Sequence, residues 1–329
     1  MPMKLNVKHK SWPIAGSFTI ARGSKTAAEV VQVTLEHGGA IGHGECVPYP
    51  RYNETVGDVI AEFEAARTTI ENGISREDVP NLLKYRAGRN ALDCALWDLE
   101  AKQTGTPVWR LAGLDAPRSL TTAYTLSLET PEKMGGTAEK NGTRPLLKLK
   151  LGADDGRDAE RLRAVRAHAP DTQLIIDANE GWGPDVLPDL LEVCAEVGVS
   201  LVEQPLPASN DSLLADIAHP IPICADESAH DAATLDQVVG KYDAVNIKLD
   251  KTGGLTNALV FAKAAEEAGL KLMTGCMLAS SLAMAPAMLV GQLCYVVDLD
   301  GPLLLAEDYD PPITFEGSIM HPAPAALWG

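Results

Sequence analysis

Two lysines, two residues apart, are the first indication of chemistry in this chain. Lys148 and Lys150 lie in the stretch Leu-Leu-Lys-Leu-Lys-Leu at residues 146–151. Because side chains alternate along a β-strand, both lysines project from one face and leucines cover the other. Two neighbouring buried ammonium groups repel each other, which predicts a lowered lysine pKa and an amine that can accept a proton. Taken alone, the stretch fits equally an amphipathic edge strand with its lysines in water.

Charged side chains recur downstream at regular intervals. Asp177, Glu203, Asp226 and Lys248 follow Lys150 at successive spacings of 27, 26, 23 and 22 residues. Each follows an apolar, strand-like run, and each interval has the length of one strand and one helix. Functional groups of barrel enzymes gather at the C-terminal ends of the strands. We therefore expect these five groups to converge on one mouth.

Three of these groups are carboxylates, which suggests a metal. Singly, Asp177 and Asp226 could equally be helix N-caps. Glu203 is harder to explain in this way, because a buried glutamate is costly unless it is paired or bound to a metal. Three carboxylates on adjacent strands repel one another without a cation, and ligands that are all oxygen suit Mg²⁺. The sequence thus predicts one Mg²⁺ per subunit.

The elements that must position these groups form a long βα repeat. Apolar runs alternate with helical stretches from residue 120 onward, the pattern of a (β/α) barrel. No full helix is expected after the last strand, where Asp300-Gly301-Pro302 leads into a Pro-rich tail, so the prediction is a modified (β/α)7β TIM barrel. A doubly wound open sheet is the alternative, but no glycine-rich phosphate loop follows a first strand. The expected strands lie near residues 121–127, 146–151, 174–177, 201–204, 223–226, 244–248, 272–275 and 295–298.

The N-terminal third has a different pattern. Alternating runs predict an antiparallel meander followed by helices, an α+β capping domain. We expect this domain at residues 1–116, the barrel at 117–302, and a tail at 303–329 that packs on the capping domain. Gly42-His43-Gly44 is explained by a hairpin, being too short for a dinucleotide loop. The expected strands are 3–7, 18–21, 30–35 and 41–45, and the expected helices are about 56–72 and 86–104.

Composition bounds the class of protein. The chain has 329 residues, of which 46% are hydrophobic, enough for a large core and two domains. A net charge of −17 argues against nucleic-acid or anionic-membrane partners, which require a basic face. Without a signal-like or membrane-length apolar run, we expect a soluble, cytoplasmic protein. Six cysteines without CxxC spacing predict buried thiols.

Two loops of the N-terminal third carry cations and aromatic residues. The first holds Arg22 and Lys25 between two expected strands, and the second, at residues 48–55, holds Arg51 beside Tyr52. Such loops are either ordinary surface or the part of a capping domain that grips an anionic substrate.

Together these motifs resemble the muconate-lactonizing subgroup of the enolase superfamily over nearly the whole chain. Asp298-x-Asp300 on the last strand is similar to dipeptide epimerases, and the two cationic loops are similar to bacterial L-Ala-D/L-Glu epimerases. Asn53 departs from the pattern, which has Gly in that loop. The motifs of the subgroup are Lys148-x-Lys150, Asp177-Ala178-Asn179, Glu203-Gln204-Pro205, Asp226-Glu227-Ser228 and Lys248.

The resemblance implies a mechanism. Asp177, Glu203 and Asp226 would hold Mg²⁺, which binds the substrate's terminal carboxylate and stabilises an enediolate. Lys150 and Lys248 would stand on opposite faces of the α-carbon and invert it by 1,1-proton transfer. The expected reaction interconverts L-Ala-D-Glu and L-Ala-L-Glu, and such a preference suggests peptidoglycan-peptide recycling.

The resemblance also implies supporting roles for several neighbouring residues. Lys148 would tune Lys150, and Asp298 with Asp300 would receive the dipeptide ammonium. Arg22 is the expected partner of the glutamate side chain. The other implied substrate-binding residues are Lys25, Arg51 and Tyr52, and Asn179 and Glu227 would support the metal ligands.

Several alternatives remain at this point. N-acylamino-acid racemase, o-succinylbenzoate synthase and muconate cycloisomerase would share the metal and the lysines, but an acyl group has no ammonium for Asp298 and Asp300. A Schiff-base aldolase would use a barrel lysine as nucleophile. A non-catalytic carboxylate-binding protein gives no reason for lysines on both sides of the metal. The sequence leaves the oligomeric state open, a homo-oligomer included.

Overall fold

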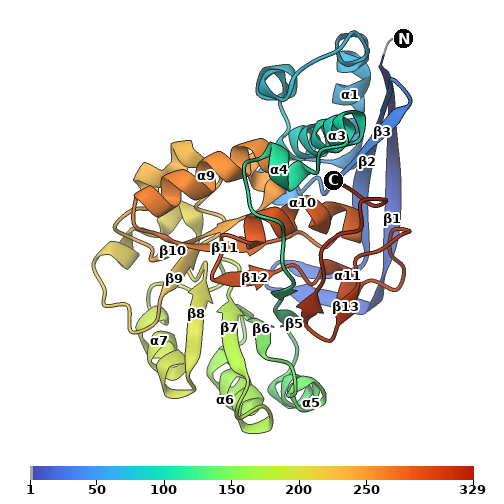
Figure 1. The fold of residues 1–329 in the computed structure, drawn as a ribbon. Helices are drawn as coiled ribbons and strands as arrows, with labels where there is room; N and C mark the ends of the chain where they lie inside the picture. The colour runs from blue at the N-terminus through green and yellow to red at the C-terminus, as the bar shows by residue number, and fades with distance from the viewer. Residues whose placement is uncertain (1–2) are drawn as a thin grey trace.

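Three long antiparallel strands form one part of the structure, a computed structural model that describes residues 3–329 (Figure 1). β1 (Lys4–Ile20), β2 (Gly23–His37) and β3 (Ala40–Cys46) pair in that order. The two strands expected at 3–7 and 18–21 are the ends of β1, whose pairing with β2 shifts register between Pro13 and Phe18. The first cationic loop is therefore shorter than predicted, because β2 begins at Gly23 and only two residues form the turn.

The glycines of β3 reflect close packing on a helix. A side chain at Gly44 would place its Cβ 2.0 Å from the Ala91 carbonyl oxygen, and one at Gly42 would meet the Ala95 carbonyl oxygen at 2.2 Å. Both carbonyls belong to α3 (Arg86–Thr104), which packs across this sheet. The Gly-x-Gly pattern thus lets the strand approach the helix backbone, in addition to forming the predicted hairpin.

Eight parallel strands form the second part. They neighbour one another in chain order, and the Ala123 amide donates to the Val297 carbonyl (2.8 Å), which joins the last strand to the first. The predicted barrel is confirmed, and the doubly wound open sheet is wrong. The strands are β5 (Tyr124–Leu126), β6 (Leu146–Lys150), β7 (Gln173–Asp177), β8 (Val199–Glu203), β9 (Ile223–Ala225), β10 (Ala244–Ile247), β11 (Lys271–Gly275) and β12 (Val296–Asp298).

Helices cover the outside of the barrel, and after β12 there is only a single turn, α11 (Gly301–Leu304). The remaining α-helices are α1 (Val56–Glu71), α2 (Val79–Leu82), α4 (Val108–Leu111), α5 (Pro131–Asn141), α6 (Asp158–His168), α7 (Leu187–Glu196), α8 (Leu249–Thr252), α9 (Leu255–Glu267) and α10 (Ser281–Gly291). Short 3-10 helices lie at Pro50–Tyr52, Arg76–Asp78, Ala208–Asn210, Ser212–Ala215 and Ala232–Gln237. Within residues 3–329, none of the helices has both the length and the apolar character needed to cross a bilayer.

The C-terminal segment returns to the N-terminal sheet and to α3. Figure 1 shows this segment, coloured red, against β1, and the Ala306 amide donates to the Pro13 carbonyl (2.8 Å). The indole of Trp328 donates to the Cys94 carbonyl of α3 (3.0 Å). A small sheet of β4 (Leu120–Thr121), β13 (Phe315–Glu316) and β14 (Ile319–Met320) ties the tail to the start of the barrel.

The barrel interior is apolar at its floor and charged above it. The floor is one buried cluster with a residue from each strand or its edge: Ala123, Leu146, Ile175, Leu201, Cys224, Ala244, Met273 and Val296. Because strand side chains alternate, the residues two positions further along also point inward. They are Lys148, Asp177, Glu203, Asp226, Asn246 and Asp298, so one step along the strands converts an apolar floor into a charged layer. All six cysteines are free thiols, four of them buried, while Cys276 and Cys294 are only partly buried.

Candidate active site

The two lysines of β6 point into the barrel. Lys148 and Lys150 are 1% and 7% exposed, and β6 lies between β5 and β7, so the alternative of an edge strand in water is wrong. The Lys150 Nζ lies 2.6 Å from the Asp177 Oδ2, and the Lys148 Nζ lies 3.3 Å from the same oxygen. Their shared contact places both ammonium groups on one face of the strand, as the alternation predicts.

Asp177, Glu203 and Asp226 are buried, and they offer carboxylate oxygens that lie within 4.8 Å of one another. One oxygen of each is held from outside the cluster. The Asp177 Oδ1 accepts from the Asn179 amide (2.8 Å), and the Glu203 Oε1 accepts from the Asn246 side chain (2.7 Å). The other oxygens of these two, the Asp177 Oδ2 and the Glu203 Oε2, face lysine ammonium groups. The barrel thus presents a compact set of inward-facing carboxylate oxygens.

The electrostatics of the lysines differ from the prediction. Burial acts to lower the pKa of Lys148, but Asp298, Glu203 and Asp177 outweigh it and hold this pKa well above its ordinary value. The same balance, with Asp226 as the strongest charge, raises the pKa of Lys248. The predicted lowering is therefore wrong for both, because carboxylates around each ammonium dominate over repulsion between lysines.

The carboxylates respond in opposite directions. Burial acts to raise the pKa of Asp226, but Lys248 and Lys251 hold it well below the ordinary range. Burial, together with the neighbouring Asp177, raises the pKa of Glu203. A carboxylate trio of this kind carries more negative charge than its surroundings stabilise at every member, which favours a bound cation.

Lys248 lies across the barrel mouth from Lys150. It follows β10 directly, and its Nζ is 2.6 Å from the Asp226 Oδ2 and 3.8 Å from the Glu203 Oε1. Lys150 contacts Asp177 at the other end of the trio. The carboxylates therefore have a lysine at each side.

The last strand contributes two buried carboxylates. The Asp298 Oδ2 lies 2.6 Å from the Lys148 Nζ, whereas its Oδ1 has no hydrogen-bond partner among the described residues. The Asp300 Oδ2 accepts from the Thr125 amide (2.6 Å). Burial and the adjacent Asp298 raise the pKa of Asp300 to about 7. These carboxylates have capacity left for a cationic group.

A cavity of about 470 Å³ lies between the capping loops and the barrel mouth. Its lining includes Lys150 and Lys248 from the barrel. From the capping side it includes all four predicted loop residues, and Asn179 and Glu227 also line it. The loop residues are Arg22, Lys25, Arg51 and Tyr52.

The loop cations are engaged to different degrees. The Arg22 guanidinium contacts the Glu227 Oε1 (2.7 Å) and donates to the Asn179 carbonyl (2.9 Å). Arg51 forms a two-point contact with Glu180 at 2.7 and 2.8 Å. Lys25 forms no ion pair within residues 3–329, and its Nζ lies 5.2 Å from the Tyr49 ring. Arg22 and Arg51 thus fasten the capping loops to the β7 loop.

Asn53 preserves the geometry that the expected glycine would supply. Its φ of 57° and ψ of 39° lie in the left-handed region, at the end of the turn that carries Arg51 and Tyr52. Asparagine is among the few non-glycine residues that adopt this conformation readily.

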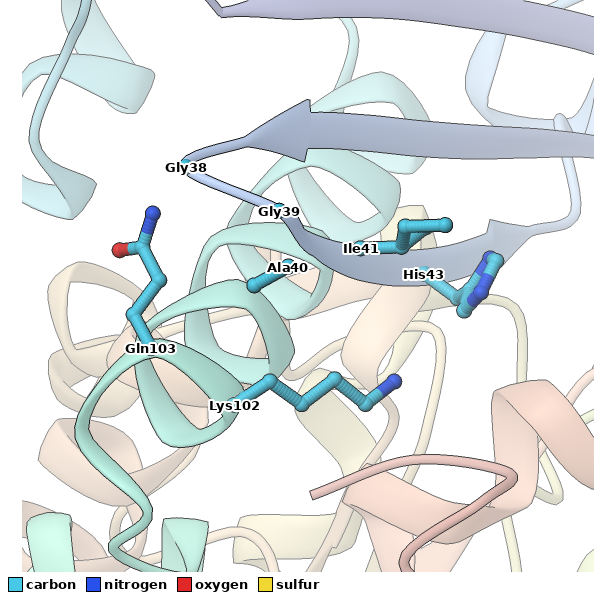
Figure 2. A pocket seen from close by; sticks show the side chains of 7 residues that line it. All are labelled: Gly38, Gly39, Ala40, Ile41, His43, Lys102 and Gln103. Atoms are coloured by element: carbon cyan, nitrogen blue, oxygen red, sulfur yellow. The ribbon is translucent and has the colours of Figure 1, made fainter.

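A second, more open hollow lies at the hairpin between β2 and β3 (Figure 2). Lys102 and Gln103 of α3 face Gly38, Gly39 and Ala40 there. The Lys102 Nζ is paired with the buried Asp98 (2.7 Å). None of the predicted site residues lines this hollow, so the cavity at the barrel mouth is the candidate active site.

Comparison with known proteins agrees with this geometry. Residues 3–113 match the N-terminal domain of mandelate racemase / muconate lactonizing enzyme, and residues 134–325 match the enolase C-terminal domain-like family. The chain belongs to this enolase-superfamily group. It is an isomerase, since its named relatives are epimerases and racemases.

Two relatives indicate how closely the group is sampled. The chain is 44% identical to L-Ala-D/L-Glu epimerase of Escherichia coli (strain K12) over 320 residues, which cover 96% of this chain and 99% of the relative. It is 41% identical to an N-acetyl-D-glutamate racemase of Pseudoalteromonas sp, with 88% and 91% covered.

Two solved structures add bound ligands. An enolase family member from Agrobacterium tumefaciens, with homology to dipeptide epimerases, is 51% identical with a TM-score of 0.97 and full coverage of both chains; it was solved with sodium and L-Ala-L-Glu. A dipeptide epimerase from Cytophaga hutchinsonii, in complex with Mg and D-Ala-L-Val, is 26% identical with a TM-score of 0.91, covering 98% and 94%.

The residues of this family member fit a divalent metal. The three carboxylates supply only oxygen, the ligand type that Mg²⁺ prefers, and the unpartnered Asp298 Oδ1 lies at the same mouth. Enolase-superfamily sites pair such a metal with a lysine or histidine base.

Sequence reasoning missed two residues of the site. The Asn246 side chain donates to Glu203, and the buried Lys251 contacts Asp226. A signal existed for Lys251, because it lies three residues after Lys248 and a single helical turn brings such residues to one side. Asn246 could have been found from strand alternation, being two residues before Lys248.

Proposed function

We propose that this enzyme epimerises the dipeptide L-Ala-Glu at the glutamate α-carbon, interconverting L-Ala-L-Glu and L-Ala-D-Glu with Mg²⁺ bound. The observation that carries the proposal is the placement of Lys150 and Lys248 on opposite sides of the carboxylate trio, with both lining one cavity. Inverting a carbon requires one group that takes a proton from one face and another that gives a proton to the opposite face.

Asp177, Glu203 and Asp226 would hold the metal. When bound, Mg²⁺ would act as a Lewis acid toward the substrate's terminal carboxylate and make the adjacent α-proton more acidic. Its positive charge would also compete with the lysines for these carboxylates and oppose the raised lysine pKa.

The lysines would perform the proton transfers. For one epimer, the neutral amine of Lys150 takes the α-proton and becomes an ammonium, while the Lys248 ammonium gives its proton to the opposite face and becomes neutral. For the other epimer the roles are exchanged. Lys148, held by Glu203 and Asp298, keeps a fixed positive charge beside the substrate carboxylate.

Substrate recognition would divide between the two parts of the molecule. Asp298 and Asp300 would receive the dipeptide ammonium, and their free acceptor capacity supports this role. Arg22 and Lys25 would face the glutamate side chain from the capping loops. Arg51 is already committed to Glu180 and would hold its loop closed, with Tyr52 contributing to the cavity wall.

Racemisation of N-acetylglutamate is the second candidate, because one relative at 41% identity carries that name. It would use the same lysines and metal, but the N-acetyl group would leave Asp298 and Asp300 without a cation. A Schiff-base aldolase and a non-catalytic carboxylate-binding protein lose support, since the chain is an isomerase by its relatives.

Proton NMR in D₂O tests the proposal. L-Ala-L-Glu and L-Ala-D-Glu are each incubated with enzyme and Mg²⁺, alongside N-acetylglutamate. We expect loss of the glutamate α-proton signal together with formation of the other epimer for both dipeptides. Exchange of N-acetylglutamate alone would contradict the proposal.

A further inference from the structure

A fourth lysine lies beneath the candidate metal site. Lys251 of α8 is fully buried, although most buried lysines in proteins require a dedicated set of partners. Its Nζ lies 2.6 Å from the Asp226 Oδ1 and 2.6 Å from the Asp226 carbonyl oxygen. It also donates to the carbonyls of Ala229 (2.8 Å) and Asn246 (2.9 Å).

These contacts connect three segments of the barrel. Asp226 follows β9, Ala229 lies in the loop after it, and Asn246 belongs to β10. Asn246 in turn donates from its side chain to the Glu203 Oε1. One ammonium group therefore fixes Asp226 directly and the strand that supports Glu203 through its backbone.

The contact with Asp226 also divides the two oxygens of that carboxylate. The Oδ1 is occupied by Lys251, whereas the Oδ2 faces Lys248 at 2.6 Å. Because Lys251 is out of reach of the cavity and Lys248 lines it, the two lysines do not have equivalent roles.

We propose that Lys251 is a positioning residue for the metal site: it holds the Asp226 Oδ1, so that the Oδ2 is the oxygen presented to the metal. The inference rests on the metal site of the proposed function. It assigns to a permanent buried cation the task of orienting one ligand, and leaves Lys248 free to exchange protons.

The test uses Lys251→Met, with Lys263→Met as the matched control, because Lys263 is an exposed lysine whose nearest carboxylate lies 3.9 Å away. Magnesium is titrated into the metal-free enzyme by calorimetry without dipeptide. Loss of a residue that orients a ligand typically costs about 10- to 100-fold in metal affinity. We expect a loss in this range for Lys251→Met and none for the control, together with loss of the Mg²⁺-induced rise in Tm. Unchanged affinity in Lys251→Met would overturn the proposal.

A second measurement remains decisive if Lys251→Met does not fold. A crystal structure of the wild-type enzyme with Mg²⁺ should have the Asp226 Oδ2 on the metal and the Lys251 Nζ still bonded to the Oδ1. Metal bound through the Oδ1, with Lys251 displaced, would overturn the inference. Both measurements omit the substrate, so a failure of dipeptide turnover would count against the proposed function and not against the role of Lys251.

Discussion

Replacing Asp300 with asparagine should separate dipeptides from N-acylated amino acids. The two side chains have the same shape, and the asparagine Oδ1 can still accept from the Thr125 amide, which now donates to Asp300 at 2.6 Å. The substitution therefore removes a negative charge and leaves the backbone contact. Asp298 keeps its ion pair with Lys148, so the lysine network is not the target.

The expected loss is the strength of one charge-assisted contact with the dipeptide ammonium. Such a contact contributes about 1.5–3 kcal/mol, which corresponds to a fall in kcat/KM of about 10- to 150-fold for L-Ala-L-Glu. N-acetylglutamate has no ammonium, so its kcat/KM, if it reacts, should not fall. Polarimetric or NMR assays of both compounds with the wild-type enzyme and the Asp300→Asn variant measure the two ratios. An equal loss for both compounds would refute this role of Asp300.

The pH dependence gives the same prediction from a different direction. The pKa of Asp300 is raised from 3.8 to about 7, first by burial and then by Asp298. The folded protein thus keeps this proton in a range where the unfolded chain has lost it, and Asp300 contributes less stability as pH rises from about 4 to above 7. Binding of an ammonium requires the ionised form, so the KM for the dipeptide should rise as pH falls below about 7. A KM that is flat across that window would exclude a titrating Asp300 from substrate binding.

Three further outcomes are expected. Arg22→Met should reduce the preference for L-Ala-L-Glu over L-Ala-L-Gln by about tenfold or more, measured as a ratio of kcat/KM, because one charged contact is lost; an unchanged ratio would assign the side chain to Lys25. Chelation with EDTA should stop α-proton exchange and lower the Tm, with Mg²⁺ restoring both; full activity after metal removal would contradict the metal site. Gly44→Ala should lower the free energy of unfolding by about 1–3 kcal/mol, since its Cβ would meet the Ala91 carbonyl at 2.0 Å, and an unchanged denaturation midpoint would refute that packing argument.

The strands and their charged ends were predictable because two regularities reinforce each other. Alternation fixes which residues face inward, and the βα repeat brings strand ends to one edge, so Lys150 and Asp177 could be placed together from spacing alone. Their 2.6 Å contact agrees with that expectation. The length of β1 could not be predicted, since the chain between Pro13 and Phe18 breaks the alternation through a shift in register.

Long-range pairing was the harder part. Nothing local indicates that Arg22 meets Glu227 or that Arg51 meets Glu180, because these partners lie on different parts of the fold. The electrostatics failed for the same reason. The pKa of Lys148 depends on Asp298, a residue 150 positions away that outweighs the effect of its neighbour in sequence.

The measurement that tests the central claim most directly is α-proton exchange in D₂O by Lys150→Ala and Lys248→Ala, each with both epimers of L-Ala-Glu and Mg²⁺. If the two lysines stand on opposite faces of the α-carbon, neither variant converts one epimer into the other. Each variant still exchanges the α-proton of one epimer only, and the two variants retain opposite epimers. Full epimerisation by either variant, or retention of the same epimer by both, would contradict a mechanism with one lysine on each face.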